Sequence, residues 1–217
     1  GFNGAGYFQI MGGKGAATIC VQGNRISIAF EKVNRLSTDG SSGGFELLGP
    51  KIGVEKFNPG YQGFGAGKDI AGPSSSAFSP DGKTVYFTGI MWAYSSHSGG
   101  PPAGSLQCVK KMNYESEEMA QVFAGKDSSE DYGSGPDQFN TPSSVDTDSK
   151  GNVYVSDFWN DRIQIFSPEG KVLSSIKTNK PAKVLVHKTT DEIFVFSYGV
   201  IGVPPNIEKE AKYNPLS

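Results

Sequence analysis

The sequence predicts an all-β fold made of repeated four-stranded antiparallel units, and three observations support this prediction. Glycine and proline are frequent, with 29 and 13 of the 217 residues, as expected of a chain with many turns. Short turn signals are flanked by alternating apolar and polar residues, which is the pattern of half-buried strands. This combination of turn and strands recurs along the chain without a long amphipathic helical pattern to interrupt it.

The composition argues against several classes of protein. The 20 Lys and Arg residues nearly balance the 22 Asp and Glu residues, so nucleic-acid binding through a broad basic face is not expected. An aromatic content of 12% argues against a disordered chain. No apolar run is long enough to span a membrane. The low share of charged residues, 19%, and the many Gly, Ser, Tyr and Asn residues lead us to expect an extracellular or periplasmic protein.

A Gly-Lys-(Gly/Asp) tripeptide marks the repeats and begins at Gly13, Gly67 and Gly125. Each copy is followed by an apolar run, a turn and an alternating strand. The turns contain Gly-Asn, Asp-Gly or Lys-Gly-Asn, which supply the positive φ angles of tight hairpins. Repeats of roughly 40 to 60 residues built from four short strands are typical of the blades of a β-propeller. We therefore expect a β-propeller.

The segment from residue 135 to 176 shows a more specific pattern in three parts. G-x-x-Q-F-x-x-P begins at Gly135, D-x-x-G-N-x-Y-V-x-D begins at Asp148, and N-x-R-I-Q-x-F begins at Asn160. In this order the three motifs closely resemble an NHL repeat. The resemblance implies a β-propeller fold, with Asn160 and Arg162 at positions that tie neighbouring strands together. It implies little about chemistry, because such propellers bind proteins, bind RNA or occasionally act as enzymes.

The repeats divide the chain into expected blades. We expect a single β-propeller domain or segment over residues 1–217, with blades at about 16–66, 73–124 and 142–176, a partial blade at 182–197 and a tail or loop at 198–217. Tyr7–Met11 is expected to be the outermost strand of a further blade. We therefore expect an incomplete segment of a larger propeller that needs other chain segments to complete it. The alternative is a closed ring of four blades, in which Asn206–Tyr213 supplies a strand.

The enlarged loops are expected on one face of the propeller. They are Glu31–Gly44 and Met91–Gly104, between the second and third strands of their blades, and Lys126–Phe139, which crosses to the third blade. Connections of these two kinds share a face in a propeller, which we term the long-loop face. Loops expanded on one side of a rigid scaffold are a common origin of binding sites, and neutral variation in loop length is the alternative explanation.

Aromatic and acidic residues of the long-loop face, with one histidine, are the candidate binding residues. They are Trp92, Tyr94, His97, Asp127, Glu130, Asp131, Phe158 and Trp159. Exposed aromatic rings are common anchors for sugars and protein partners, and the acidic residues add a negative rim suited to a basic or hydroxyl-rich partner. The alternative is that the rings pack over the blade edges.

The sequence lacks the spacing of a metal, cofactor or catalytic motif. Asp146 and Asp148 open a calcium-loop-like pattern, but no carboxylate follows at the bidentate position, and the same residues favour a hairpin turn. The histidines and cysteines are too scattered for a zinc site, and Cys20 and Cys108 are either small buried side chains or a disulfide. We therefore assign no catalytic residue, no metal ligand and no cofactor.

The function that we expect is that of a non-catalytic binding or assembly module of a secreted or surface protein, with a protein or a carbohydrate as its partner. The alternative is a propeller enzyme, a lactonase-like hydrolase or a lyase, with a metal in the axial channel. Such an enzyme would draw its polar groups from several inner strands. On the expected inner strands this sequence offers Ser76, Ser144, Asp146 and His187.

Overall fold

The computed structural model of the protein describes residues 18–29, 33–39, 70–71, 73–92, 106–128 and 130–197. These residues form antiparallel sheets, and the one helical element among them is the short 3₁₀ turn η1 (Phe158–Asn160). No helix in the described ranges is long and apolar enough to cross a membrane. The expected all-β architecture of four-stranded antiparallel blades is therefore confirmed.

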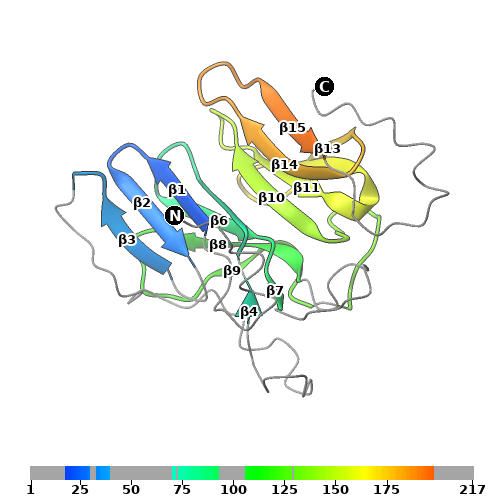
Figure 1. Cartoon of the computed structure of the whole chain (residues 1–217), viewed down its shortest axis with the longest axis horizontal. Coiled ribbons are helices and arrows are strands. Elements are labelled where there is room, and N and C mark those ends of the chain that lie inside the picture. The colour runs from blue at the N-terminus through cyan, green and yellow to red at the C-terminus, as the bar shows by residue number, and fades with distance from the viewer. Residues whose placement is uncertain are drawn as a thin grey trace.

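The strands form successive sheets along the chain (Figure 1). The first sheet contains β1 (Thr18–Gln22), β2 (Arg25–Ala29) and β3 (Val33–Ser37). The second contains β5 (Ser75–Phe78), β6 (Thr84–Thr88), β8 (Gln107–Asn113) and β9 (Gln121–Lys126). The third contains β10 (Pro142–Thr147), β11 (Val153–Asp157), β12 (Arg162–Phe166) and β13 (Val172–Lys177). The fourth contains β14 (Pro181–Val186) and β15 (Ile193–Ser197), and a short ladder joins β4 (Ile70–Ala71) to β7 (Met91–Trp92).

Tight turns join the first two strands of the first three sheets. The turn glycines have positive φ angles: Gly23 (57°), Gly82 (68°) and Gly151 (87°). In the third sheet the carboxylate of Asp148 accepts hydrogen bonds from the backbone N–H groups of Lys150 and Asn152, at 2.9 and 2.8 Å. The calcium-loop-like stretch is therefore a hairpin turn, and its second aspartate is occupied by that turn.

The first sheet differs from the sequence-based expectation. The sequence predicts a long loop over Glu31–Gly44, but β3 lies inside this segment and pairs with β2 along its whole length. Val33, the first residue of β3, is fully buried in the core between the first two sheets. The glycine-rich run near residue 43 favoured the prediction of a loop. A short strand nevertheless lies before this run and pairs with the strand that precedes it in the sequence. The expectation of an uninterrupted loop over Glu31–Gly44 is wrong.

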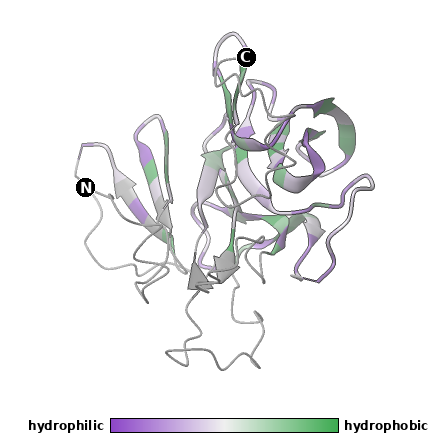
Figure 2. Ribbon diagram, turned by 45° about the vertical axis from the view of Figure 1, so that its right-hand side comes forward, coloured by the Kyte–Doolittle hydropathy of each residue, from purple (hydrophilic) through white to green (hydrophobic). Residues whose placement is uncertain are grey.

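Apolar cores lie between successive sheets and hold them together face to face. The core between the first and second sheets includes Val33, Val85, Phe87 and Met112. The core between the second and third includes Val109, Phe139, Val145 and Phe166. The core between the third and fourth includes Tyr154, Ile163, Val184 and Val186. Figure 2 shows the corresponding apolar segments within the strands, with polar segments along the turns.

The first strands of the four sheets lie side by side, in the order β1, β5, β10 and β14. Hydrogen bonds link neighbours in this row. The hydroxyl groups of Thr18 in β1 and Ser76 in β5 are 2.9 Å apart, and the backbone N–H of Val184 in β14 donates to the hydroxyl of Ser144 in β10 at 3.2 Å. This convergence of first strands is the arrangement expected around the axis of a propeller.

Cys20 and Cys108 are both free thiols, so the disulfide alternative is wrong. Burial raises the pKa of Cys108 to about 12 and that of Cys20 to about 11, so both thiols stay protonated at neutral pH. The two terminal segments for which strands were expected or considered, Tyr7–Met11 and Asn206–Tyr213, lie outside the described residues.

Candidate functional site

The long-loop face is built from connections that meet at one end of the sheets. In the third blade η1 joins β11 to β12, and the backbone N–H of Phe158 in η1 donates to the carbonyl oxygen of Thr141, in the crossing from β9 to β10, at 3.3 Å. In the second blade Trp92 of β7 pairs with Ile70 of β4, so the connection after β6 meets the segment before β5. The expectation that these two kinds of connection share a face is confirmed for the described residues.

The carboxylate of Asp157 lies at the end of β11, fully buried beneath this face. It accepts hydrogen bonds from Nε of Arg162 at 2.8 Å, from Nδ2 of Asn160 at 2.9 Å and from the backbone N–H of Asn140 at 2.7 Å. Burial raises the pKa of Asp157, and these three hydrogen bonds oppose that rise because they favour the ionised form. The carboxylate thus joins β11, η1, β12 and the crossing before β10.

Arg162 and Asn160 also hold the crossing by its backbone carbonyl groups. The guanidinium of Arg162 donates to the carbonyl oxygens of Ser134 at 2.8 Å and Gly135 at 2.9 Å. The side-chain amide of Asn160 donates to the carbonyl oxygen of Gly133 at 2.7 Å. A planar guanidinium presents several donors in a fixed geometry, which makes such a clamp stiff. The structural role predicted for Asn160 and Arg162 is therefore confirmed.

Several non-glycine residues with positive φ angles gather at this face. They are Asp137 (56°), Thr141 (63°), Asp161 (52°) and Lys180 (40°). Hydrogen bonds hold these conformations: the backbone N–H of Thr141 donates to Oε1 of Gln107 at 2.8 Å, and that of Lys180 donates to Oδ1 of Asp161 at 2.9 Å. Each such conformation costs on the order of 1–3 kcal/mol and persists only where its surroundings determine it, often at functional sites.

Asp127, a predicted rim residue, is the partner of a buried lysine. Its carboxylate accepts a hydrogen bond from Nζ of Lys110 at 2.9 Å, and the Lys110 side chain is only 2% exposed. An ammonium group so buried requires a counter-charge nearby. Asp127 therefore neutralises Lys110, and its contribution to a negative rim is small.

The two neighbouring aromatic residues of η1 differ in exposure. Phe158 is 6% exposed and packs edge-on against Trp159, with ring centroids 5.0 Å apart. It offers almost no surface to a partner, so packing over the blade edge is the correct interpretation for Phe158. Trp159 is partly exposed, and Nζ of Lys180 lies 5.2 Å from its ring centroid.

Exposed acidic and aromatic side chains precede the clamped part of the crossing. Glu130 and Asp131 are exposed, as a binding rim requires, and Tyr132 beside them is 66% exposed. Tyr132 was not among the residues predicted from the sequence. The sequence pattern that could have indicated an exposed Tyr132 is an aromatic residue between an acidic pair and Gly133, in a segment too polar to be a strand. The other predicted residues are not placed here: the side chain of Trp92, and all of Tyr94 and His97, lie outside the described residues.

The polar residues predicted on inner strands form a second group. Ser76, Ser144 and Asp146 belong to β5 and β10 and are buried among the first strands. His187 is instead exposed in the turn after β14, where its Nδ1 lies 3.0 Å from the hydroxyl of Thr190. Within the described part of the chain, no three His, Cys, Asp or Glu side chains gather as a metal site would require.

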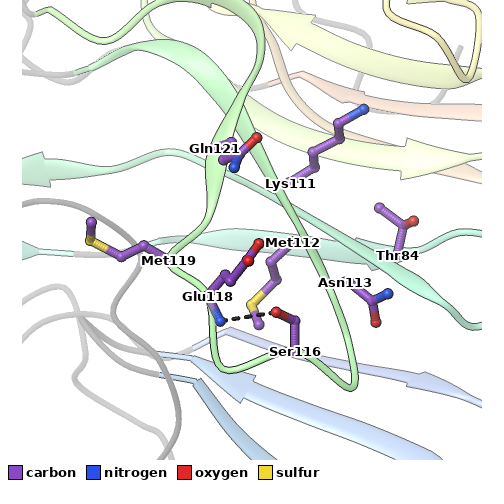
Figure 3. A pocket seen from close by; sticks show the side chains of 8 residues that line it. All are labelled: Thr84, Lys111, Met112, Asn113, Ser116, Glu118, Met119 and Gln121. Carbon is purple, nitrogen blue, oxygen red and sulfur yellow. Dashed lines mark hydrogen bonds between the residues drawn. The ribbon is translucent and has the colours of Figure 1, made fainter.

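A hollow of about 240 Å³ lies beside the opposite end of the second sheet (Figure 3). It is lined by Thr84, Lys111, Met112, Asn113, Ser116, Glu118, Met119 and Gln121. The backbone N–H of Glu118 donates to the hydroxyl of Ser116 at 2.9 Å, which fixes the turn at its rim. None of the predicted binding residues lines it, so it is separate from the long-loop face.

Comparison with known proteins agrees with this architecture. The NHL repeat family matches residues 139–166, and no curated protein sequence matches the chain. A gluconolactonase from Xanthomonas campestris is similar in structure, with 14% identity, a TM-score of 0.50 and coverage of 82% of this chain and 52% of that one. The hydrazine synthase of Kuenenia stuttgartiensis is also similar in structure, with 13% identity, a TM-score of 0.51 and coverage of 86% of this chain and 42% of that one.

A nidogen/laminin complex contains a third similar structure, with 16% identity, a TM-score of 0.50 and coverage of 85% of this chain and 59% of that one. The chain thus spans about half the length of these three structures. At such low identities the likeness shows the fold alone. Residues 139–166 are an NHL repeat, and the chain folds into blades of the β-propeller type.

Proposed function

We propose that this protein is a non-catalytic binding or assembly module that engages a protein or carbohydrate partner through its long-loop face. The observation that supports this proposal is the crossing from β9 to β10. Its residues 133–140 are clamped by Asp157, Asn160 and Arg162, while the preceding Glu130–Tyr132 projects into solvent. A surface loop held rigidly at its base loses little conformational entropy when it binds.

The other carboxylates of this face already serve the structure. Asp157 is bonded to Arg162, Asp127 is paired with Lys110, and Asp161 accepts a hydrogen bond from Nζ of Lys180 at 2.7 Å. A general acid or base must exchange a proton with substrate, and carboxylates held by the chain's own cations are less available for that exchange. This distribution favours binding over acid–base catalysis.

The exposed residues suggest the chemistry of the partner. Glu130 and Asp131 supply negative charge, and Tyr132 and Trp159 supply aromatic surface with a polar edge. Such a combination suits a basic peptide surface or a hydroxyl-rich glycan. A secreted or surface-associated location is part of this proposal and is supported by the low share of charged residues.

The test uses two printed arrays, one of oligosaccharides and one of Lys- and Arg-rich peptides. We expect the protein to bind members of one array. Tyr132→Ala should weaken that binding by about tenfold or more, as for an aromatic anchor. Phe194→Ala, which removes an exposed ring from β15, is the matched control and should leave binding unchanged. Equal binding by wild type and Tyr132→Ala would show that the long-loop face is not used in this way.

A metal-dependent propeller enzyme is the second candidate function. It is favoured by the buried Asp146, Ser144 and Ser76 among the inner strands, where several blades contribute polar groups. This candidate predicts that calcium raises the melting temperature and that the protein hydrolyses a sugar lactone such as δ-gluconolactone. Lactone hydrolysis that requires calcium, together with no binding on either array, would favour the enzyme.

A further inference from the structure

Lys183 in β14 extends across the row of first strands. Its Nζ lies 3.2 Å from the hydroxyl oxygen of Ser75 in β5, although β10 lies between these two strands. A side chain that spans two blades in this way must point toward the axis on which the first strands converge. The residue is partly buried, so its side chain is partly shielded from water.

The carboxylate that the described inner strands bring to this cluster is already occupied by other groups. Asp146 in β10 forms an ion pair with Lys188 through Oδ1, and its Oδ2 accepts the backbone N–H of Val186 at 2.8 Å. In the described part of the chain, no carboxylate oxygen lies within 4.0 Å of the Lys183 ammonium. Asp146 is thus paired with the half-exposed Lys188, and among the described residues Lys183 has no ion-pair partner of its own.

The remaining described groups around Lys183 are neutral. Burial raises the pKa of Cys20 to about 11, so this thiol cannot serve as the counter-ion at neutral pH. Burial also lowers the pKa of Lys183, and Asp146 opposes that shift. The other nearby groups of the inner strands are hydroxyls: Thr18, Ser75, Ser76 and Ser144. Hydroxyl groups can rotate to donate to a negatively charged oxygen.

We propose that this axial cluster binds a small monoanionic carboxylate, with the ammonium group of Lys183 as its charged anchor and inner-strand hydroxyls as further donors. Buried charges in proteins are normally paired, and within the described residues Lys183 has no carboxylate of its own. A monoanion would balance the charge of Lys183, whereas a metal cation would add to it. The proposal is independent of the long-loop face, because none of its residues belongs to that surface.

The test measures thermal unfolding of the whole chain in acetate and in lactate, against equal concentrations of sodium chloride and of acetamide. Acetamide has the shape of acetate without its charge. At a concentration ten times its dissociation constant, acetate should raise the melting temperature by about 3–5 °C. Acetamide and chloride should have no comparable effect.

Variants of Lys183 assign the effect to this residue. Lys183→Met should abolish the acetate shift and leave the melting temperature in chloride unchanged or higher, because it removes an uncompensated charge. Lys183→Arg should retain at least half of the shift. Lys177→Met removes an exposed lysine of β13 and is the matched control, with a wild-type response expected.

Two results would overturn the proposal. The first is that acetate does not raise the melting temperature of the wild type, that acetamide raises it equally, or that Lys183→Met retains the acetate shift. The second is a large fall in the melting temperature of Lys183→Met in chloride, because it would show that a carboxylate of the chain itself already pairs with Lys183.

Discussion

The Asp157 carboxylate joins three parts of the third blade through hydrogen bonds. It anchors Arg162 from β12, Asn160 from η1 and the backbone of Asn140 from the crossing. Because the carboxylate is fully buried, removing it leaves the Arg162 guanidinium without its counter-charge and Asn140 without an acceptor. At the residue scale, this one side chain holds together the third-blade part of the long-loop face.

Asp157→Ala should therefore lower the free energy of unfolding by about 3–5 kcal/mol, the usual cost of breaking a buried ion pair by removing one partner. The measurement is equilibrium unfolding in urea. Glu117→Ala is the matched control, because Glu117 also pairs with an arginine, at 2.6 Å, but its side chain is 74% exposed. That pair should contribute about 0–1 kcal/mol. Similar costs for the two variants would contradict the structural role of Asp157.

Sequence reasoning succeeded where a motif specifies its own contacts. Asn160 and Arg162 were predicted as structural residues, and their bonds to the crossing confirm it. Sequence reasoning was less successful in predicting which side chains are exposed. Phe158 and Trp159 are adjacent aromatic residues, and only Phe158 is buried. Whether a ring in a short turn faces core or solvent depends on how η1 lies over the crossing, and no local pattern encodes that contact.

At the scale of elements, strands were predictable where a turn signal lies between two alternating runs. The hairpins β5–β6 and β10–β11 follow this pattern, with Asp-Gly and Lys-Gly-Asn at their turns. β3 lacks such a signal, because the connection that precedes it contains no glycine, asparagine or aspartate, and the glycine-rich run comes only after it. Its position is determined instead by pairing with β2 and by burial of Val33.

Val33→Ala tests whether β3 is an integral strand of the first sheet. Val33 is fully buried between the first and second sheets, so losing two methyl groups should cost about 2 kcal/mol in the free energy of unfolding. Ile19→Ala in β1 is the matched control, because Ile19 is 52% exposed in the same sheet and its truncation should cost less than about 1 kcal/mol. Equal, small effects in both variants would indicate that this segment is a loop, as the sequence suggested.

At the scale of the whole molecule, each core joins one sheet to the next, and the first and fourth sheets each have one face outside this series. On β1 the side chains of Ile19 and Val21 are 52% and 54% exposed. On the fourth sheet Leu185, Phe194 and Phe196 are 41%, 50% and 47% exposed, while Val184 and Val186 of the same sheet face the third. The repeat pattern predicted blades, but the number of blades in a ring depends on what covers these faces, which periodicity does not encode.

These two apolar faces lead us to expect that the 217-residue chain self-associates in solution, because contiguous exposed apolar surface favours association. Leu185 and Phe194 are direct cross-strand partners in β14 and β15, so the double substitution Leu185→Lys, Phe194→Glu places opposite charges side by side without disturbing the ladder. Sedimentation velocity over a range of concentrations should show an average mass that rises for the wild type and rises much less for the double variant. The melting temperature should change little, since both residues face away from the core with the third sheet.

Leu173→Lys is the matched control, because Leu173 is 53% exposed on the outermost strand β13 and lies on neither face. Self-association that is lost in Leu173→Lys and retained in the double variant would assign the contact to the outer strands of the blades instead.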